Sequence, residues 1–439
     1  MKKIVVAGAG HGGLIAATHL ARAGYDVTVV EMKEKGNVGH DWHDMMDVPT
    51  VSDAGIDPPD EKDYHEGLNI SYRSPKKGAL VPTEFDRSKQ PIHIDRKTLL
   101  NHLISQAEKA GAKIVYEHKI LRPICSGAWV TGIVATDGEK EIEYKADLVI
   151  DAAGMNSPVR SNLPSHFGIL NEIESRNIFE IYRAYFKNST GETVDNAFTV
   201  DMFHIDKPGI DWAMVTEEYV DVLIGKFKMC GDLTQDEIDT AIADYKKVYP
   251  FMSDEIIRGG SIAPIPIRRM LSLIVANGYA AVGDSAGMTI PLNGSGIILS
   301  ILAGKILAQV VIEAGEKELT KSALWKYQYE YFTKHGKDLV IIDIIKNFFT
   351  YVKGDDVNYL LENGVLTAKE IAIADGKPLE ISPEYIYRQL KTCLPLAPLL
   401  PSLLKVFKTV PAMPFVVNSI PEEYDEYKVS RWVEKYSAL

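Results

Sequence analysis

The chain has little cysteine and no long uninterrupted apolar run, and both absences exclude classes of protein. Its three cysteines, Cys125, Cys230 and Cys393, lie far apart and form no CxxC pair. This argues against a zinc knuckle, an iron–sulfur site or a disulfide framework, and favours a reducing, cytoplasmic compartment. No uninterrupted apolar run reaches the length of about eighteen residues that indicates a spanning helix, so none is predicted.

The chain also has fewer positive than negative side chains. The chain carries 48 Lys and Arg against 60 Asp and Glu, which gives a net charge of −12, so a nucleic-acid partner is not expected. The 439 residues exceed one ordinary core, and the apolar and charged fractions are those of a globular protein. We therefore expect two or three closely packed domains.

The clearest motif lies in the first 31 residues. A short β-branched run ends in a GxGxxG sequence formed by Gly8, Gly10 and Gly13; a helical pattern and a second apolar run follow, and that run ends on Glu31. Gly8 allows a tight turn, Gly10 lets the backbone approach a pyrophosphate, and Gly13 lets the helix pack on the strand. The helix start can bind phosphate, and Glu31 can accept both ribose hydroxyls. These features predict a dinucleotide site, for FAD or NAD.

A second glycine-rich stretch begins at residue 278. Residues 278–287 (GYAAVGDSAG) read as a strand ending in Gly-Asp, and residues 291–296 (PLNGSG) lead into a long apolar helix. Asp284 can bind a ribityl hydroxyl, while Gly294 and Gly296 leave free N–H groups at the helix start. Such a helix start stabilises facing negative charge by about 0.3–2 kcal/mol, which suits a reduced flavin.

Together these motifs resemble those of flavoproteins with the p-hydroxybenzoate hydroxylase fold, and within it the geranylgeranyl reductase family. The resemblance covers residues 1 to about 315 and includes Asp95-Arg96 before a helix and the stretch 151–160. It implies an FAD cofactor, with Arg96 at the pyrophosphate or ribityl region and Asp284 at the ribityl chain. It also implies that Pro291, Gly294 and Gly296 lie beside the isoalloxazine ring, and that the turn ending in Gly154 supports the interior of the FAD domain.

The expected fold is therefore α/β. A Rossmann-type FAD-binding domain is expected over residues 1–177 and 271–335, and a helical C-terminal region over 336–439. Between residues 178 and 270 the apolar pattern changes to a period of two, which predicts an antiparallel-sheet substrate domain. Residues 32–90 are expected to form an insertion of turns and short strands.

Candidate catalytic residues lie in one loop and one strand. Residues 36–47 contain His40 and His43, which lack the further ligands of a metal site and can serve as proton donors or hydrogen-bond partners. Trp212 stands where geranylgeranyl reductases often have a YxWxFP(K) strand, although the Phe-Pro-Lys part is absent here. Tyr182 is a further proton-donor candidate.

The leading functional hypothesis is reduction of C=C bonds in an apolar, isoprenoid-like substrate by hydride transfer from reduced flavin. Alternatives are a monooxygenase using NAD(P)H and O2, an electron-transfer flavoprotein acting on a quinone, and a non-redox flavin-dependent cyclase or hydratase. Because only one GxGxxG occurs, NAD(P)H would bind transiently over the flavin, or a redox partner protein would supply electrons. No WxWxIP motif of flavin-dependent halogenases is found.

The stretch 393–417 is strongly apolar but broken by prolines, which excludes a spanning helix there. One interpretation is a set of helices that caps the substrate domain. The other is a lid or a peripheral membrane contact that admits a lipophilic substrate. In that case Lys405 and Lys408 point to headgroups, and Leu403, Leu404 and Phe407 point inward.

Overall fold

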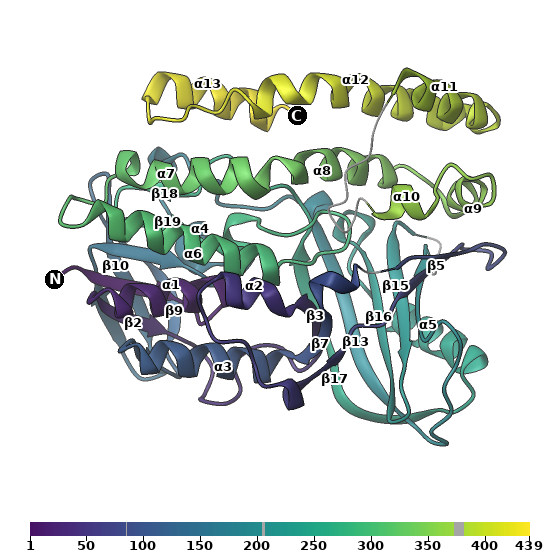
Figure 1. Ribbon diagram of the computed structural model, residues 1–439, viewed down its shortest axis with the longest axis horizontal. Coiled ribbons are helices and arrows are strands. Elements are labelled where there is room, and N and C mark those ends of the chain that lie inside the picture. Colours follow the sequence, from purple (N-terminus) through teal and green to yellow (C-terminus); the bar gives the residue numbers. More distant parts are fainter. Residues whose placement is uncertain (85, 204–206, 373–381) are drawn as a thin grey trace.

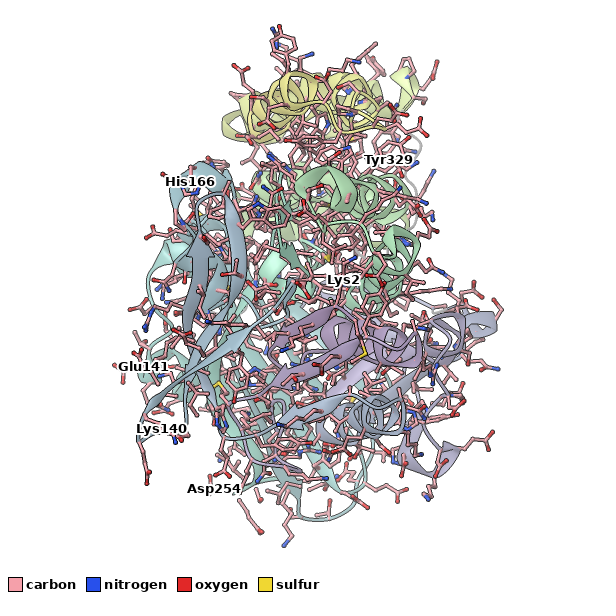
Figure 2. The ribbon with its side chains drawn as sticks, turned by 90° about the vertical axis from the view of Figure 1, so that its left-hand side faces the viewer. Lys2, Lys140, Glu141, His166, Asp254 and Tyr329 are labelled. Carbon is pink, nitrogen blue, oxygen red and sulfur yellow. The ribbon has the colours of Figure 1, made fainter. Side chains whose placement is uncertain are left out.

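The computed structural model describes residues 1–84, 86–203, 207–372 and 382–439, without the side chains of residues 397, 398, 405, 407 and 412. Figure 1 shows a mainly parallel sheet with helices on the left, an antiparallel sheet in teal on the right, and C-terminal helices in yellow along the top. Figure 2 shows the same yellow layer from the side, with Asp254 at the opposite end of the molecule. This arrangement confirms the predicted fold class.

The left-hand sheet is the Rossmann-type unit predicted from the glycine motif. In spatial order its strands are β18 (Val275–Ala276), β19 (Tyr279–Ala281), β12 (Leu148–Asp151), β1 (Lys3–Ala7), β2 (Asp26–Val30) and β8 (Lys113–Val115). All neighbours except β18 and β19 pair in parallel, and Val5 lies opposite Thr28 on one side and Val149 on the other. The central strands are buried, which explains their β-branched, unalternating sequence.

Three helices pack around this sheet. They are α1 (His11–Arg22), α3 (Arg96–Lys109) and α6 (Ile297–Ala314), at the positions predicted from sequence. Helix α6 is long and apolar enough to cross a membrane, yet half of its residues are buried inside the protein. A Cβ at Gly304 of α6 would lie 2.1 Å from the carbonyl oxygen of Gly12, so α6 and α1 are in backbone contact. Its apolar composition is therefore that of a core helix.

The short elements of the left-hand part hold its loops in place. Two three-stranded sheets join β9 (Lys119–Ser126), β10 (Trp129–Thr136) and β11 (Glu141–Lys145), and β3 (His43–Asp47), β7 (Pro91–Asp95) and β4 (Tyr64–Glu66). Short helices are α2 (Val48–Asp53) and α4 (Pro158–Ser161). The pairing of His43 with Asp95 sets the candidate loop beside the start of α3, where Asp95 caps the helix by accepting from the Thr98 N–H at 2.7 Å.

The right-hand sheet has seven strands and is mostly antiparallel, as predicted. Its order is β17 (Met252–Pro266), β13 (Ile178–Asn188), β16 (Tyr219–Phe227), β15 (Gly209–Val215), β14 (Phe198–Met202), β5 (Ile70–Arg73) and β6 (Leu80–Pro82). Strands β5 and β6 belong to the predicted insertion, and β5 pairs in parallel with β14. The boundaries predicted for the three domains stay a prediction, but this sheet draws strands from outside residues 178–270. Helix α5 (Gln235–Val248), closed by a capping box between Thr234 and Glu237, contributes to a core on one face of the sheet.

The C-terminal region after residue 336 is helical, as expected. Helix α7 (Lys321–Tyr331) precedes it, and its own helices are α8 (Asp338–Phe349), α9 (Gly354–Glu362), α10 (Ala368–Ile371), α11 (Pro383–Thr392), α12 (Leu400–Val417) and α13 (Glu426–Ser437). A π-helical segment, Phe332–Gly336, joins α7 to α8. Trp432 and Tyr436 of α13 pack on Phe332, which attaches the yellow layer of Figure 1 to the helices below it.

Candidate cofactor and substrate site

The glycine turn between β1 and α1 packs directly on the backbone that follows β12. Gly8 has a φ of +88°, and a Cβ at Gly8 or Gly10 would lie 2.8 or 2.9 Å from the carbonyl oxygen of Ala152. A Cβ at Gly13 would lie 2.5 Å from the Ala152 Cβ and 2.9 Å from Cγ1 of Val6. Only glycine fits these positions, as the tight turn, the open cradle and the helix packing require. Their contact with a cofactor stays a prediction.

Glu31 lies at the end of β2 and supports the same turn. Its Oε2 accepts from the Ala9 N–H at 2.9 Å, and its Oε1 accepts from the Lys33 N–H at 2.9 Å. A carboxylate has about four acceptor positions, so both oxygens keep capacity for two further hydroxyl donors. This geometry fits the predicted binding of a ribose diol.

Arg96 begins α3 and reaches across to the candidate loop. Its Nε and Nη2 donate to the two carboxylate oxygens of Asp44 at 2.5 and 2.6 Å, and its guanidinium lies 5.0 Å from the centre of the Trp42 ring. Burial alone would raise the pKa of Asp44, but the charge and hydrogen bonds of Arg96 hold that pKa below its ordinary value. Arg96 is therefore fixed in place by a bidentate pair.

Two further groups respond to the charge of Arg96. Burial and then Arg96 lower the pKa of His11, the first residue of α1, to about 4, and its buried Nε2 has no hydrogen-bond partner among the described residues. Burial raises the pKa of Asp284, and Arg96 opposes that rise. The start of α1 and the Gly-Asp turn therefore lie within the electrostatic reach of a single arginine.

The second glycine stretch begins α6 next to α1. Gly296 caps α6, and one turn later the Ser300 hydroxyl accepts from the Gly12 N–H at 3.0 Å. A Cβ at Gly296 would lie 3.0 Å from Cγ2 of Thr289, and one at Gly294 would lie 3.0 Å from Cγ2 of Ile265. The two predicted helix starts are therefore neighbours, although they lie far apart in sequence.

The remaining predicted cofactor residues lie in turns beside these helix starts. Pro291 is buried at the beginning of the loop that leads to α6. Gly154 has a φ of +81° in the turn after β12, and its carbonyl oxygen accepts from the Ser157 N–H. Two helix N-termini, a basic group, an unpartnered imidazole nitrogen and glycine-lined backbone fit the phosphates and ribityl chain of FAD. The residues that would hold FAD are Gly8, Gly10, Gly13, Glu31, Arg96, Gly154, Asp284, Pro291, Gly294 and Gly296.

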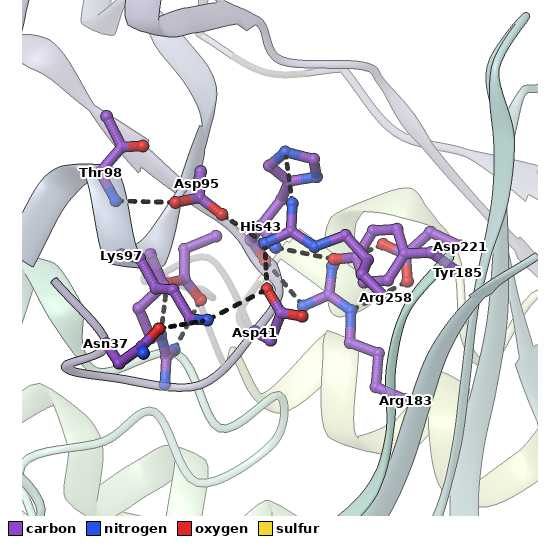
Figure 3. Close-up of polar contacts among 12 residues, drawn as sticks. Asn37, Asp41, His43, Asp95, Lys97, Thr98, Arg183, Tyr185, Asp221 and Arg258 are labelled. Atoms are coloured by element: carbon purple, nitrogen blue, oxygen red, sulfur yellow. Dashed lines mark hydrogen bonds and ion pairs between the residues drawn. The ribbon is translucent and has the colours of Figure 1, made fainter. Parts of the chain in front are cut away.

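His43 is bonded to the face of the antiparallel sheet (Figure 3). Its N–H donates to the Tyr185 hydroxyl at 2.7 Å, and its carbonyl oxygen accepts from Arg183 at 2.7 Å. Its Nε2 lies 3.2 Å from Arg258 Nη1, and its Nδ1 lies 3.3 Å from the Tyr219 hydroxyl. Because a guanidinium can only donate, Nε2 accepts, and the ring proton is assigned to Nδ1. Burial and Arg258 lower the pKa of His43, so the ring is neutral near pH 7.

Arg183 is the centre of this part of the site, and the sequence analysis did not single it out. It donates to both carboxylate oxygens of Asp221, with Nε at 2.9 Å and Nη2 at 2.5 Å. Its guanidinium also lies 5.4 Å from the centre of the Trp212 ring and 5.8 Å from that of Trp42. Asp221 and a nearby tyrosine outweigh the effect of burial and raise the pKa of Arg183. A charged residue at an inward position of β13, between Ile181 and Tyr185, was the available signal.

The predicted catalytic residues lie around Trp42 but not at one point. His40 stacks on Trp42 with ring centres 4.2 Å apart, and burial and Arg96 lower the pKa of His40 to about 4. Trp212 lies on the sheet, over Arg183. Tyr182 packs in the core on the other face of the sheet, because side chains alternate along β13, so it does not join the group. Within the ranges described, no cluster of His, Cys, Asp and Glu could hold a metal.

An apolar cavity of about 180 Å³ lies between the antiparallel sheet and the C-terminal helices. The sheet contributes Phe179, Ile210 and Phe227, on the face that also carries Arg183 and Trp212. The PLNGSG loop contributes Leu292 and Asn293 at another wall. Further walls come from α8 to α12: Ile345, Phe348, Phe349, Leu360, Val365, Leu366, Glu370, Ile371, Tyr385, Gln389, Leu403 and Val406. The cavity therefore reaches the loop that is predicted to flank the isoalloxazine ring.

Known proteins share both the motifs and the fold. Residues 1–208 match the FAD binding domain family. A digeranylgeranylglycerophospholipid reductase from Sulfolobus acidocaldarius is 22% identical over 385 residues, covering 85% of this chain and 83% of the relative. A second such reductase, from Methanococcoides burtonii, is 26% identical over 369 residues, covering 81% of this chain and 86% of the relative.

Solved structures agree in fold. A geranylgeranyl bacteriochlorophyll reductase-like protein from Thermoplasma acidophilum superposes with a TM-score of 0.73 at 18% identity, covering 92% of this chain and 99% of the other. The myxobacterial chondrochloren halogenase superposes with a TM-score of 0.63 at 16% identity, covering 99% of this chain and 96% of the halogenase. The solved structures share the fold of this chain, the sequence matches agree with the resemblance to geranylgeranyl reductases, and the match of residues 1–208 to the FAD binding domain family supports FAD as the cofactor.

Proposed function

Since this chain is an FAD-dependent oxidoreductase similar to the geranylgeranyl reductases, we propose that it reduces carbon–carbon double bonds in an apolar, isoprenoid-like substrate. FAD, when bound and reduced, supplies hydride for one alkene carbon. The protein must then hold the alkene, exclude water and deliver a proton to the other carbon.

The apolar cavity is the observation that carries this proposal. Its walls are mostly aliphatic and aromatic side chains, and Leu292 and Asn293 connect it to the loop that precedes α6. Burying a chain of CH₂ groups there is favourable by about 0.8 kcal/mol for each group. A hydroxylase acting on a small polar aromatic compound would gain little from such walls.

The proton is assigned to the hydrogen-bonded pair of His43 and Tyr219. Burial, and then the negative charge of Asp221, raise the pKa of Tyr219 to about 12, so its hydroxyl stays protonated near neutral pH. The Nδ1–H of His43 donates a hydrogen bond to the Tyr219 oxygen and stabilises the tyrosinate that forms when Tyr219 gives up its proton; water then returns a proton to Tyr219. Arg183 and Arg258 keep His43 oriented.

The electron donor belongs to the proposal as well. NAD(P)H that binds transiently over the flavin is one source, and a redox partner protein is the other. Dithionite replaces either source in the test below, so the alkene chemistry can be measured without knowing the donor.

The test uses FAD-loaded protein, reduced with dithionite under anaerobic conditions and mixed with a prenyl phosphate. We expect reoxidation of the flavin and a saturated product by mass spectrometry. Flavin that reoxidises only with O2 in the presence of an aromatic substrate and NAD(P)H would instead identify a monooxygenase. Reoxidation by a quinone without any alkene would identify an electron-transfer protein, and either result contradicts the proposal.

A further inference from the structure

A second cavity, of about 390 Å³, lies beside the apolar one and differs from it in polarity. The two cavities share Phe348 of α8 and Val406 of α12 as lining residues. The second cavity is bounded by the chain after β17, by α8, by α12 and by the end of α13. Its walls carry three arginines (Arg176, Arg268 and Arg269), two carboxylates (Glu174 and Asp343), and amide and hydroxyl side chains. We call it the basic pocket.

In the basic pocket Arg176 is paired with Glu174, and Asp343 is paired with two cations. Arg269 donates to Asp343 at 2.6 Å, and the fully buried Lys346 lies 3.0 Å from the other oxygen of the same carboxylate. Lys346 also donates to Asn177 at 2.8 Å. Asp343 therefore already serves two cations, and its pKa is held below the ordinary value despite burial.

Arg268 is the third arginine of the pocket and has no carboxylate of its own. Its Nε donates to the carbonyl oxygen of Arg269 at 2.9 Å, and within the described ranges no ion pair to its guanidinium is formed. Burial lowers its pKa, and the neighbouring Arg269 and Arg160 act in the same direction against Asp343. A half-buried guanidinium in this position gains from an anionic ligand, because desolvated charge is costly unless it is paired.

We propose that the basic pocket binds a phosphate group through Arg268, and that this phosphate is the head of the amphiphile whose apolar chain occupies the neighbouring cavity. A planar guanidinium suits phosphate because two N–H groups can donate to two oxygens in parallel. The shared wall at Phe348 and Val406 sets the polar and apolar compartments side by side. The assignment of the chain to the apolar cavity rests on the proposed function, whereas the phosphate site in the basic pocket does not.

The test compares a prenyl phosphate with the prenyl alcohol of the same chain, using FAD-loaded protein with no tag attached after Leu439, because Leu439 lines the pocket. Calorimetric affinity for both compounds and for inorganic phosphate is measured. We expect the wild type to bind the prenyl phosphate about ten-fold or more tightly than the alcohol, since a charge-assisted bond is roughly twice as strong as a neutral one. Arg268→Gln should lose that preference, and Arg268→Lys should keep part of it.

Arg176→Gln is the matched control. Arg176 lines the same pocket, but its side chain is 59% exposed and paired with Glu174, so this variant should keep the preference for phosphate. FAD content and the circular dichroism spectrum establish that each variant is folded. Equal preference in folded Arg268→Gln and wild type would overturn the proposal.

Two further measurements distinguish a site for free phosphate from a site for a lipid head group, and distinguish the phosphate site from the proposed function. The phosphate site is contradicted if inorganic phosphate binds the wild type and Arg268→Gln equally and does not weaken the binding of prenyl phosphate. Inorganic phosphate that competes with prenyl phosphate in an Arg268-dependent manner supports it. If no alkene is reduced by any variant while the Arg268-dependent preference persists, the proposed function fails and the phosphate site stands.

Discussion

One added methyl group at Gly13 would overlap two neighbours, at 2.5 Å from the Ala152 Cβ and 2.9 Å from Cγ1 of Val6. Val6 lies in the central strand β1 and Ala152 directly follows β12, so neither can move freely. We expect Gly13→Ala to lower the free energy of unfolding by about 1–3 kcal/mol and to weaken FAD binding, because overpacking displaces α1. Denaturant titration and FAD fluorescence measure both effects.

Gly24→Asn is the comparison for that variant. Gly24 follows the end of α1 with a φ of +87°, and a Cβ there would meet nothing within 4 Å. Asn tolerates the left-handed conformation, so stability and FAD affinity should stay near those of the wild type. A similar loss of FAD from both variants would show that the close packing at Gly13 is not the reason for the weaker FAD binding.

The buried histidines predict how stability depends on pH. Burial lowers the pKa of His11, His40 and His93 to about 4, from an ordinary value of 6.5. Between these values the unfolded chain binds more protons than the folded chain, so the free energy of unfolding should fall as the pH drops from about 6.5 to about 4. The paired carboxylates, such as Asp44, add to the loss only at lower pH.

His93→Gln tests this dependence away from the proposed cofactor groups. Unfolding by denaturant is followed for the wild type and the variant at about pH 7.5 and about pH 5. The wild type should lose more stability between the two values than the variant does. His166→Gln, at a surface position, should behave like the wild type, and an equal pH response of all three proteins would contradict the assignment.

At the scale of single elements, α12 combines an inner and an outer apolar face. Leu403 faces the apolar cavity, whereas Leu404 is 42% exposed and Phe415 is 82% exposed. The side chains of Lys405 and Phe407 lie outside the described residues, so their predicted directions stay open. We propose that the outer face of α12 touches the membrane surface from which a lipophilic substrate enters.

Phe415→Ser should therefore reduce co-sedimentation with anionic phospholipid vesicles by about five-fold or more, because one exposed aromatic side chain contributes about 1.5–3 kcal/mol when buried. Stability should not change, since the side chain has few neighbours in the protein. Tyr427→Ser removes a 70% exposed aromatic residue of α13 and serves as the control. Equal vesicle binding of all three proteins would rule out this face.

Most helices and strands were predictable from the local sequence pattern. The strands that were missed depend on irregular backbone or on distant partners. The period of 3.6 and the glycine boundaries placed α1 and α6, and the period of two over residues 178–270 predicted the antiparallel sheet that contains β13 and β16. Strand β17 escaped because Gly259 and Gly260 interrupt it with positive φ values and its register against β13 shifts. Strand β5 escaped because its parallel partner β14 lies far along the chain, which no local pattern reveals.

The site shows the same division between local and distant information. The glycines of both helix starts were identifiable because backbone geometry excludes other residues there. His40 and His43 were predicted as candidates in one loop, yet the structure places His40 near Arg96 and His43 against Arg183. The ion pair of Arg183 with Asp221 joins two strands and depends on their register. The sequence alone shows only a charged residue at a buried position in each strand.

At the scale of the whole molecule, FAD should connect segments that lie nearly three hundred residues apart in the chain. The proposed cofactor residues come from β1, β2, α3 and the start of α6, so the bound ligand stabilises their contact. FAD at about 100 times its dissociation constant should add about 2.7 kcal/mol to the free energy of unfolding. Thermal unfolding at increasing FAD concentration measures this effect, and a midpoint independent of FAD would contradict the site.

The interleaving of the two sheets has a consequence for biosynthesis. Strand β19 pairs with β12 but leaves the ribosome more than a hundred residues after it, once β13 to β17 have been made. Strand β5 emerges early and waits for β14. Neither half of the polypeptide can mature by itself during translation, so a nascent chain halted before residue 279 should be held by chaperones or degraded.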